Sequence, residues 1–280
     1  MAKATASRRR VGQPLTPSLL KKMAVFKHLS PPDETFDAAG DWTGTYRIWA
    51  CHGFLRNGNN DFGFLRIDRR IENLDETFTL EITQHLHQAQ GMTHIIKAEV
   101  ECRADALATP LKWYLSSRFV SIDEESPDDL AAEETVRVDE SGLDIETAGH
   151  KLRRPLKRPF TGDWNLFEAI QRLPFPSGNT PSFTVLEGLS LPKEGHHLTY
   201  RGSEPLDDPV CPRLHRFTQL GQATLPYDYW LDEQHRLQVA ITMSRAYILD
   251  DRAEEIARRF QTSQQQSYRK AKQRSRGGIK

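Results

Sequence analysis

Apolar and polar residues alternate along much of the chain, which is the pattern of strands with one buried and one exposed face. The alternation is clearest at 78–83, where apolar residues take every second position. Other short segments are rich in aromatic and β-branched residues, and turn-forming residues such as Asn57-Gly58 separate them. The expected strands are 45–51, 62–71, 78–83, 93–102, 111–122, 135–138, 143–145, 183–186, 198–201, 214–220, 227–231, 237–243 and 247–249.

A single central segment, 165–173, has strong helical periodicity. Its apolar residues fall on one stripe, Asn165 can cap the helix, and Glu168 stands three places on, as in a capping box. Pro174 ends the segment because proline cannot continue a helix. We expect this helix to fill the concave side of a curved sheet; the alternative is a helix outside, covering a sheet edge.

These elements predict a mainly β fold, a curved antiparallel sheet or open barrel with one central amphipathic helix and flexible basic termini. Residues 1–40 would form a basic N-terminal arm that contains a short amphipathic helix near 19–27. Residues 41–251 would form a single β-rich domain. The remaining segment, 252–280, would be helical to about 260 and then disordered, because its composition is polar and basic.

The formal net charge of zero hides an asymmetry between the termini and the body. Residues 1–32 contain seven basic residues and no acidic one, and residues 252–280 contain nine basic and two acidic residues. The intervening body then has 22 basic against 36 acidic residues. Such arms can contact nucleic acid, anionic lipid or the acidic body itself, or can remain as solvated, mobile termini.

Several classes of protein are disfavoured by what the 280-residue chain lacks. It has no run of about 18 apolar residues, so no transmembrane helix is expected. Three widely spaced cysteines do not suggest a disulfide framework and favour free thiols. The arginines at 8–10 are followed by prolines and lysines rather than an apolar export segment, so we expect a cytoplasmic protein.

Two stretches resemble segments of certain bacterial domains of unknown function. One is 162–174 (GDWNLFEAIQRLP), a short helix ending at Leu-Pro, and the other is 229–237 (YWLDEQHRL), a Trp-Leu-Asp turn followed by Arg-Leu. Those domains are similar to the lipoprotein-carrier fold, a half-barrel sheet with a helix on its concave face. The likeness spans about 42–250 in the order of elements. It implies a cavity for an apolar ligand or partner segment rather than a reaction.

Three histidines offer one candidate for metal chemistry. His85 and His87 share one strand face, and His94 follows on the partner strand, so the three imidazoles are a candidate zinc site with an open fourth position, as a metal-dependent hydrolase requires. The alternative is that these histidines continue the polar face of the strand. Cys51 and His52 are adjacent, so they would point to opposite faces and could not share a proton.

Stronger catalytic signatures are missing from the sequence. It contains no phosphate-binding loop, dinucleotide fingerprint, nucleophile elbow or His-Glu-x-x-His motif, which disfavours kinases, dehydrogenases and common hydrolases without deciding whether the protein is an enzyme. We therefore favour a non-enzymatic binding or interaction protein whose cavity takes an apolar small molecule or lipid. Its candidate lining residues are Trp49, Phe64, Trp113 and Trp230; the alternative is that they are packed core.

Overall fold

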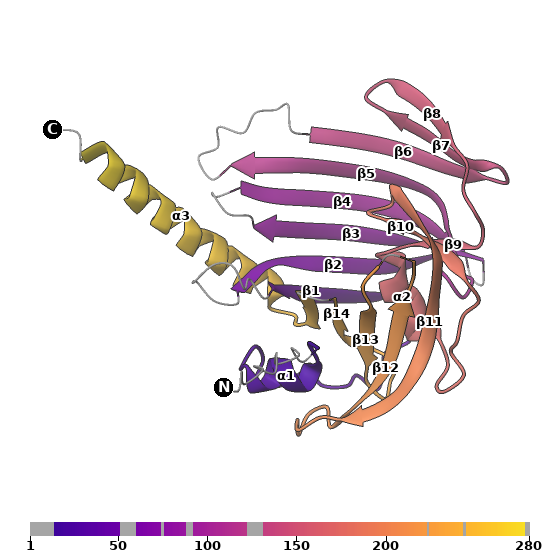
Figure 1. The fold of residues 1–280 in the computed structure, drawn as a ribbon, viewed down its shortest axis with the longest axis horizontal. Helices are drawn as coiled ribbons and strands as arrows, with labels where there is room; N and C mark the ends of the chain where they lie inside the picture. The colour runs from indigo at the N-terminus through magenta and orange to yellow at the C-terminus, as the bar shows by residue number, and fades with distance from the viewer. Residues whose placement is uncertain are drawn as a thin grey trace, which may run out of the picture.

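One large curved sheet dominates the computed structural model, which describes residues 14–50, 60–73, 76–87, 92–121, 131–222, 224–242 and 245–277. Fifteen strands in these ranges pair in the order β8-β7-β6-β5-β4-β3-β2-β1-β15-β14-β13-β12-β11-β10-β9. Neighbours are antiparallel except β9 and β10, which are parallel. The sheet bends strongly but its two edge strands do not pair (Figure 1). The prediction of a mainly β, curved and open sheet is confirmed.

The strands closely follow the alternating pattern of the sequence. In the first half they are β1 (Trp42–Ala50), β2 (Asn60–Asn73), β3 (Thr77–His87), β4 (Met92–Arg103), β5 (Pro110–Ser121), β6 (Ala131–Asp139), β7 (Gly142–Thr147) and β8 (His150–Arg154). In the second half they are β9 (Phe160–Gly162), β10 (Phe183–Glu187), β11 (Leu191–Pro205), β12 (Arg213–Leu220), β13 (Tyr227–Leu231), β14 (Leu237–Ile241) and β15 (Arg245–Leu249). The edge strands β8 and β9 are absent from the prediction, because β8 is exposed throughout and β9 has only three residues.

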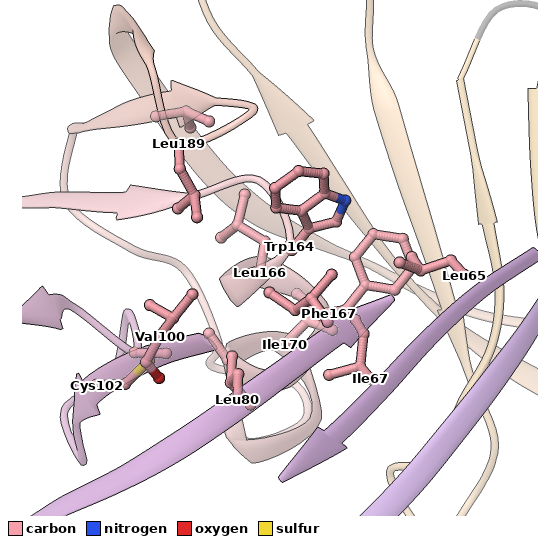
Figure 2. Close-up of a cluster of buried hydrophobic side chains, with 14 of the residues drawn as sticks. Leu65, Ile67, Leu80, Val100, Cys102, Trp164, Leu166, Phe167, Ile170 and Leu189 are labelled. Atoms are coloured by element: carbon pink, nitrogen blue, oxygen red, sulfur yellow. The ribbon is translucent and has the colours of Figure 1, made fainter. Parts of the chain in front are cut away.

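Helix α2 (Asn165–Arg172) lies inside the curve of the sheet, as Figure 1 shows. Its Leu166, Phe167 and Ile170 are buried against side chains from β2, β3 and β4 (Figure 2). Full burial of such a side chain contributes roughly 1.5–3 kcal/mol, so this stripe holds the helix on the concave face. Helix α2 lies on the concave side, but it is one of three helices in the described residues, so the prediction of a single central helix is not confirmed.

The prediction of a capping box at the start of this helix is wrong. Trp164 occupies the cap position, and no side chain caps the helix there. Asn165 instead points into the sheet, where its Nδ2 donates to the carbonyl of Ala108 at 2.9 Å. Gly162 makes this possible, because a Cβ there would lie 2.4 Å from Oδ1 of Asn165. Glu168 likewise turns to the sheet, where it pairs with arginines instead of the helix backbone.

The N-terminal segment packs on the convex face of the sheet. Helix α1 (Pro17–Lys22) and the chain after it bury Leu20, Phe26 and Leu29 in a second apolar cluster. Asp208, in the β11–β12 connection, accepts hydrogen bonds from Nζ of Lys21 at 2.9 Å and from the Leu29 amide at 3.3 Å. The expectation of a mobile arm therefore does not hold for residues 14–32, since their apolar groups find a surface; residues 1–13 lie outside the described residues.

Helix α3 (Ala253–Gly277) begins on the convex face and then leaves the body (Figure 1). Its first turns pack Ala253 and Ala257 against Phe64 of β2. The expected disorder after 260 is contradicted as far as Gly277, where the chain continues as helix. Gln, Lys and Arg make up much of this stretch and have high intrinsic helix propensity, which the composition-based expectation of disorder did not take into account.

Candidate ligand-binding cleft

A cleft of about 890 Å³ opens on the concave side of the sheet, beside α2. One wall comes from β3 to β7 and the other from β10 to β13 and β15, so residues more than one hundred positions apart face each other. Trp164 and Phe167 contribute the helix side of the cleft. The lining mixes apolar and aromatic side chains with a smaller set of polar ones, which is the usual character of a small-molecule site.

Tyrosine rings gather around one phenylalanine in the wall next to α2. Tyr227 and Tyr229 stack with centroids 4.8 Å apart, and Tyr247 lies 6.4 Å from Tyr227. Phe167 meets Tyr247 edge-on at 5.4 Å and Tyr229 at 6.1 Å. The register places Ala240 between Tyr229 and Tyr247, and this small residue separates the two rings across the sheet. Edge-on pairs of this kind contribute about 0.5–1.5 kcal/mol each beyond burial, so the aromatic wall is well ordered.

The partly buried carboxyl group of Asp163 lies at the start of α2. Its oxygens accept hydrogen bonds from the amides of Trp164 at 3.0 Å and Gly188 at 3.1 Å. Burial raises the pKa of Asp163 to about 6, although these two hydrogen bonds oppose the shift. Burial, and then the negative charge of Asp163, also hold the pKa of Tyr229 well above its ordinary value. The tyrosine hydroxyls therefore remain protonated at neutral pH.

A chain of hydrogen bonds crosses β13, β12 and β11 on the same face. The hydroxyl of Tyr229 donates to Oε1 of Gln219 at 2.8 Å, and Nε2 of Gln219 donates to Nδ1 of His196 at 2.9 Å. Burial, with smaller contributions from Lys193 and His197, lowers the pKa of His196. The imidazole is therefore neutral at pH 7 and is held in one orientation.

Charged groups line the mouth of the cleft. Nζ of Lys193 lies 2.6 Å from a carboxylate oxygen of Glu187. Across the opening, Glu134 accepts a hydrogen bond from Nε1 of Trp113 at 3.2 Å and one from the hydroxyl of Ser190 at 3.4 Å. The Ser190–Glu134 contact links the two walls although their strands do not pair.

Three of the four aromatic residues proposed from the sequence to line a cavity face the other side of the sheet. Trp49 and Trp230 lie in the convex cluster covered by α1, and Phe64 lies under α3. Trp113 is on the concave side within the main core, but it does not line the cleft. Alternation in the sequence shows which residues of a strand share a face. It does not show which face is concave, because that depends on the side of the sheet that α2 covers.

The register also separates the three histidines of the proposed zinc site. His85 and His87 point to the convex face, where His87 lies 6.2 Å from Phe260 of α3. His94 pairs with Leu86, so it points to the concave face, and its Nε2 lies 2.8 Å from the hydroxyl of Ser117. Burial, followed by the neighbouring His85, lowers the pKa of His87 to about 4. In the described residues no three His, Cys, Asp or Glu side chains come together as metal ligands.

The cysteines give no reactive pair within the described part of the chain. Cys102 and Cys211 are buried free thiols, and burial raises the pKa of both. Cys51 and His52 lie outside the described residues.

Sequence reasoning missed the polar residues of the cleft, above all His196. Glu194-Gly195, just before it, is typical of an exposed turn, but His196 is only 3% exposed. The sequence did contain a signal for the face of these residues. His196 stands two positions before Leu198, and Tyr227 stands two before Tyr229, so the residues of each pair lie on the same face of a strand. Asp163 gave no such signal, since its position depends on the contact between α2 and the Gly188 turn.

Comparison with known proteins finds similarity only to solved structures and at low sequence identity. No family model matches the sequence, and no curated protein matches it. Across the described residues, no helix combines the length and the apolar character needed to cross a membrane. A β-barrel-like protein of domain of unknown function DUF1849 from Brucella abortus matches at 8% identity and TM-score 0.48, covering 76% of this chain and 96% of its own. A DUF1089 family protein from Pseudomonas aeruginosa matches at 11% identity and TM-score 0.36, covering 66% and 91%.

Proposed function

We propose that this protein is a non-enzymatic binding protein that holds an apolar or amphipathic small molecule in the concave cleft. The observation that carries the proposal is the aromatic wall of Tyr227, Tyr229, Tyr247 and Phe167 inside a cleft of about 890 Å³. Ligand sites in proteins commonly have volumes of about 300–1,000 Å³ and are lined by such side chains.

The polar groups of the cleft favour recognition of a ligand. The oxygens of Asp163 already accept backbone hydrogen bonds, and Tyr229 and Gln219 are engaged with each other. Groups fixed in this way present a set surface to a ligand at little cost in conformational entropy.

A tryptophan placed in the cleft tests the proposal. Ala132 of β6 is exposed and lines the cleft, so Ala132→Trp should fill the space without disturbing the core. We expect the uncharged dye Nile red to bind the unaltered protein with increased fluorescence. Its affinity should fall at least tenfold in Ala132→Trp, because one ring would occupy the volume that the dye requires.

The neighbouring residue provides the matched control. Ala131 belongs to the same strand and points to the opposite face, so Ala131→Trp should bind Nile red as the unaltered protein does. Equal affinity in all three proteins, or no binding to any, would contradict a ligand site in the cleft.

A further inference from the structure

We infer that the distal half of helix α3, residues 262–277, binds the phosphate backbone of a nucleic acid duplex. The inference is independent of the cleft, which opens on the concave side of the sheet, whereas α3 starts on the convex face. Three observations carry it: the helix continues beyond its contacts with the body, its distal half is basic with no acidic residue, and that half has almost no apolar residues.

The distal half of α3 extends away from the sheet. Nε2 of Gln261 lies 3.4 Å from Oγ1 of Thr93 in β4, which ties the helix to the sheet at this point. Beyond it the described side chains are exposed, namely those of Thr262, Ser263, Gln266, Ser267 and Lys270. Figure 1 shows the helix continuing away from the body. This half of the helix is therefore open to a partner.

The sequence of this half of the helix is strongly basic. Residues 256–277 include seven basic residues and no acidic one, and five of the seven fall between 269 and 276. A protein segment that neutralises phosphates releases the counterions condensed on the duplex, so such a run of positive charge favours binding. Most of the other residues at 262–277 are Gln, Ser or Thr, whose side chains also form hydrogen bonds with phosphates.

The length of the helix separates this charge from the acidic body. At about 1.5 Å per residue, position 269 lies about 12 Å beyond Gln261 along the axis, and position 276 about 22 Å. The Debye length is about 8 Å at physiological ionic strength, so the carboxylates of the body are largely screened from these positions. The extension can therefore meet a polyanion that the body itself would repel.

The composition favours a nucleic acid over a membrane surface. A helix that lies in a membrane interface has residues such as Trp, Phe and Leu on one side. Residues 262–277 contain none of these, and Tyr268 is their one aromatic residue. A helix about 10–12 Å in diameter fits the major groove of DNA, which is about 12 Å wide. A second copy of the same helix is disfavoured because like charges repel.

Binding of a fluorescein-labelled DNA duplex of about 20 base pairs, followed by anisotropy, tests the inference. We expect the full chain to bind at about 50 mM salt, with a slope of about −3 to −5 in log K against log salt concentration, for up to five phosphate contacts. The triple variant Lys270→Gln, Lys272→Gln, Arg274→Gln should weaken binding at least tenfold and make the slope shallower by about 2 to 3. Glutamine has a helix propensity close to that of lysine and arginine, so the melting temperature should not change.

A matched control removes the same charge from the body. Arg137, Lys151 and Arg201 are exposed residues of β6, β8 and β11. Their joint replacement by glutamine changes the net charge equally, and we expect the affinity for DNA to stay within about threefold. Equal weakening in the two triple variants would refute the inference, because the effect would then reflect net charge and not the helix.

Vesicles of phosphatidylcholine with phosphatidylserine distinguish a membrane from a nucleic acid. At equal anionic charge and physiological salt, we expect the full chain to bind the vesicles more weakly than the duplex. Tighter binding to the vesicles, lost in the Lys270→Gln, Lys272→Gln, Arg274→Gln variant, would make the partner a membrane and overturn the inference. Failure of the full chain to bind the duplex at about 50 mM salt would overturn it as well.

Discussion

Glu168 shows how one buried side chain joins the helix to the sheet. It is fully buried, and its Oε1 lies 3.0 Å from Nε of Arg69 in β2 and 2.6 Å from Nε of Arg172 in α2. Arg69 also donates to the carbonyl of Gly40 at 2.7 Å and lies 4.1 Å from the ring centroid of Phe78. Removing one member of such a network is costly because it leaves charges buried without their partner.

Glu168→Gln should therefore destabilise the protein by about 3–5 kcal/mol, measured as a lower midpoint in urea unfolding. Glu146→Gln is the control, since Glu146 is 61% exposed and its partner Lys151 is 83% exposed. Loss of an exposed pair of this kind should cost less than about 1 kcal/mol. Similar small losses in both variants would show that Glu168 does not hold α2 on the sheet.

At the scale of the elements, local pattern was sufficient to predict most strands and the helix α2. Segment 227–231 has the predicted bounds, and α2 differs from its prediction by one residue at its end. The face of each strand was harder to predict: Trp230 and Tyr229 are neighbours in one strand, yet only Tyr229 reaches the cleft. That distinction depends on α1 and α2 covering opposite faces, which periodicity alone does not determine.

The contacts of α3 predict that its two halves contribute unequally to stability. Ala253, Ala257 and Phe260 pack on the body, so a chain ending at Asp251 should melt several degrees lower. A chain ending at Thr262 keeps these contacts, and its melting temperature should change by about 1 °C or less. If this longer chain also melts several degrees lower at low salt, and the difference shrinks as salt is added, the basic extension docks on the acidic body instead.

At the scale of the whole molecule, the cleft is a product of sheet curvature. Asp163, His196 and Tyr247 come from three distant parts of the chain and line one space because the sheet bends around α2. The spacing of residues in the sequence does not show that these three side chains come together. The sequence therefore predicted a cavity in a curved sheet but not the residues that line it. The same limit applies to the three histidines of the proposed zinc site. The register between β3 and β4 places His94 on the opposite face of the sheet from His85 and His87.

The five tryptophan indoles allow the most direct test of where a ligand binds. Trp164 lines the cleft, whereas Trp49 and Trp230 are buried on the convex face under α1. In ¹H–¹⁵N spectra recorded during titration with Nile red, we expect the indole signal of Trp164 to shift with saturation, while those of Trp49 and Trp230 stay in place. Shifts at Trp49 and Trp230 with an unchanged Trp164 would contradict the assignment of the concave cleft as the binding site.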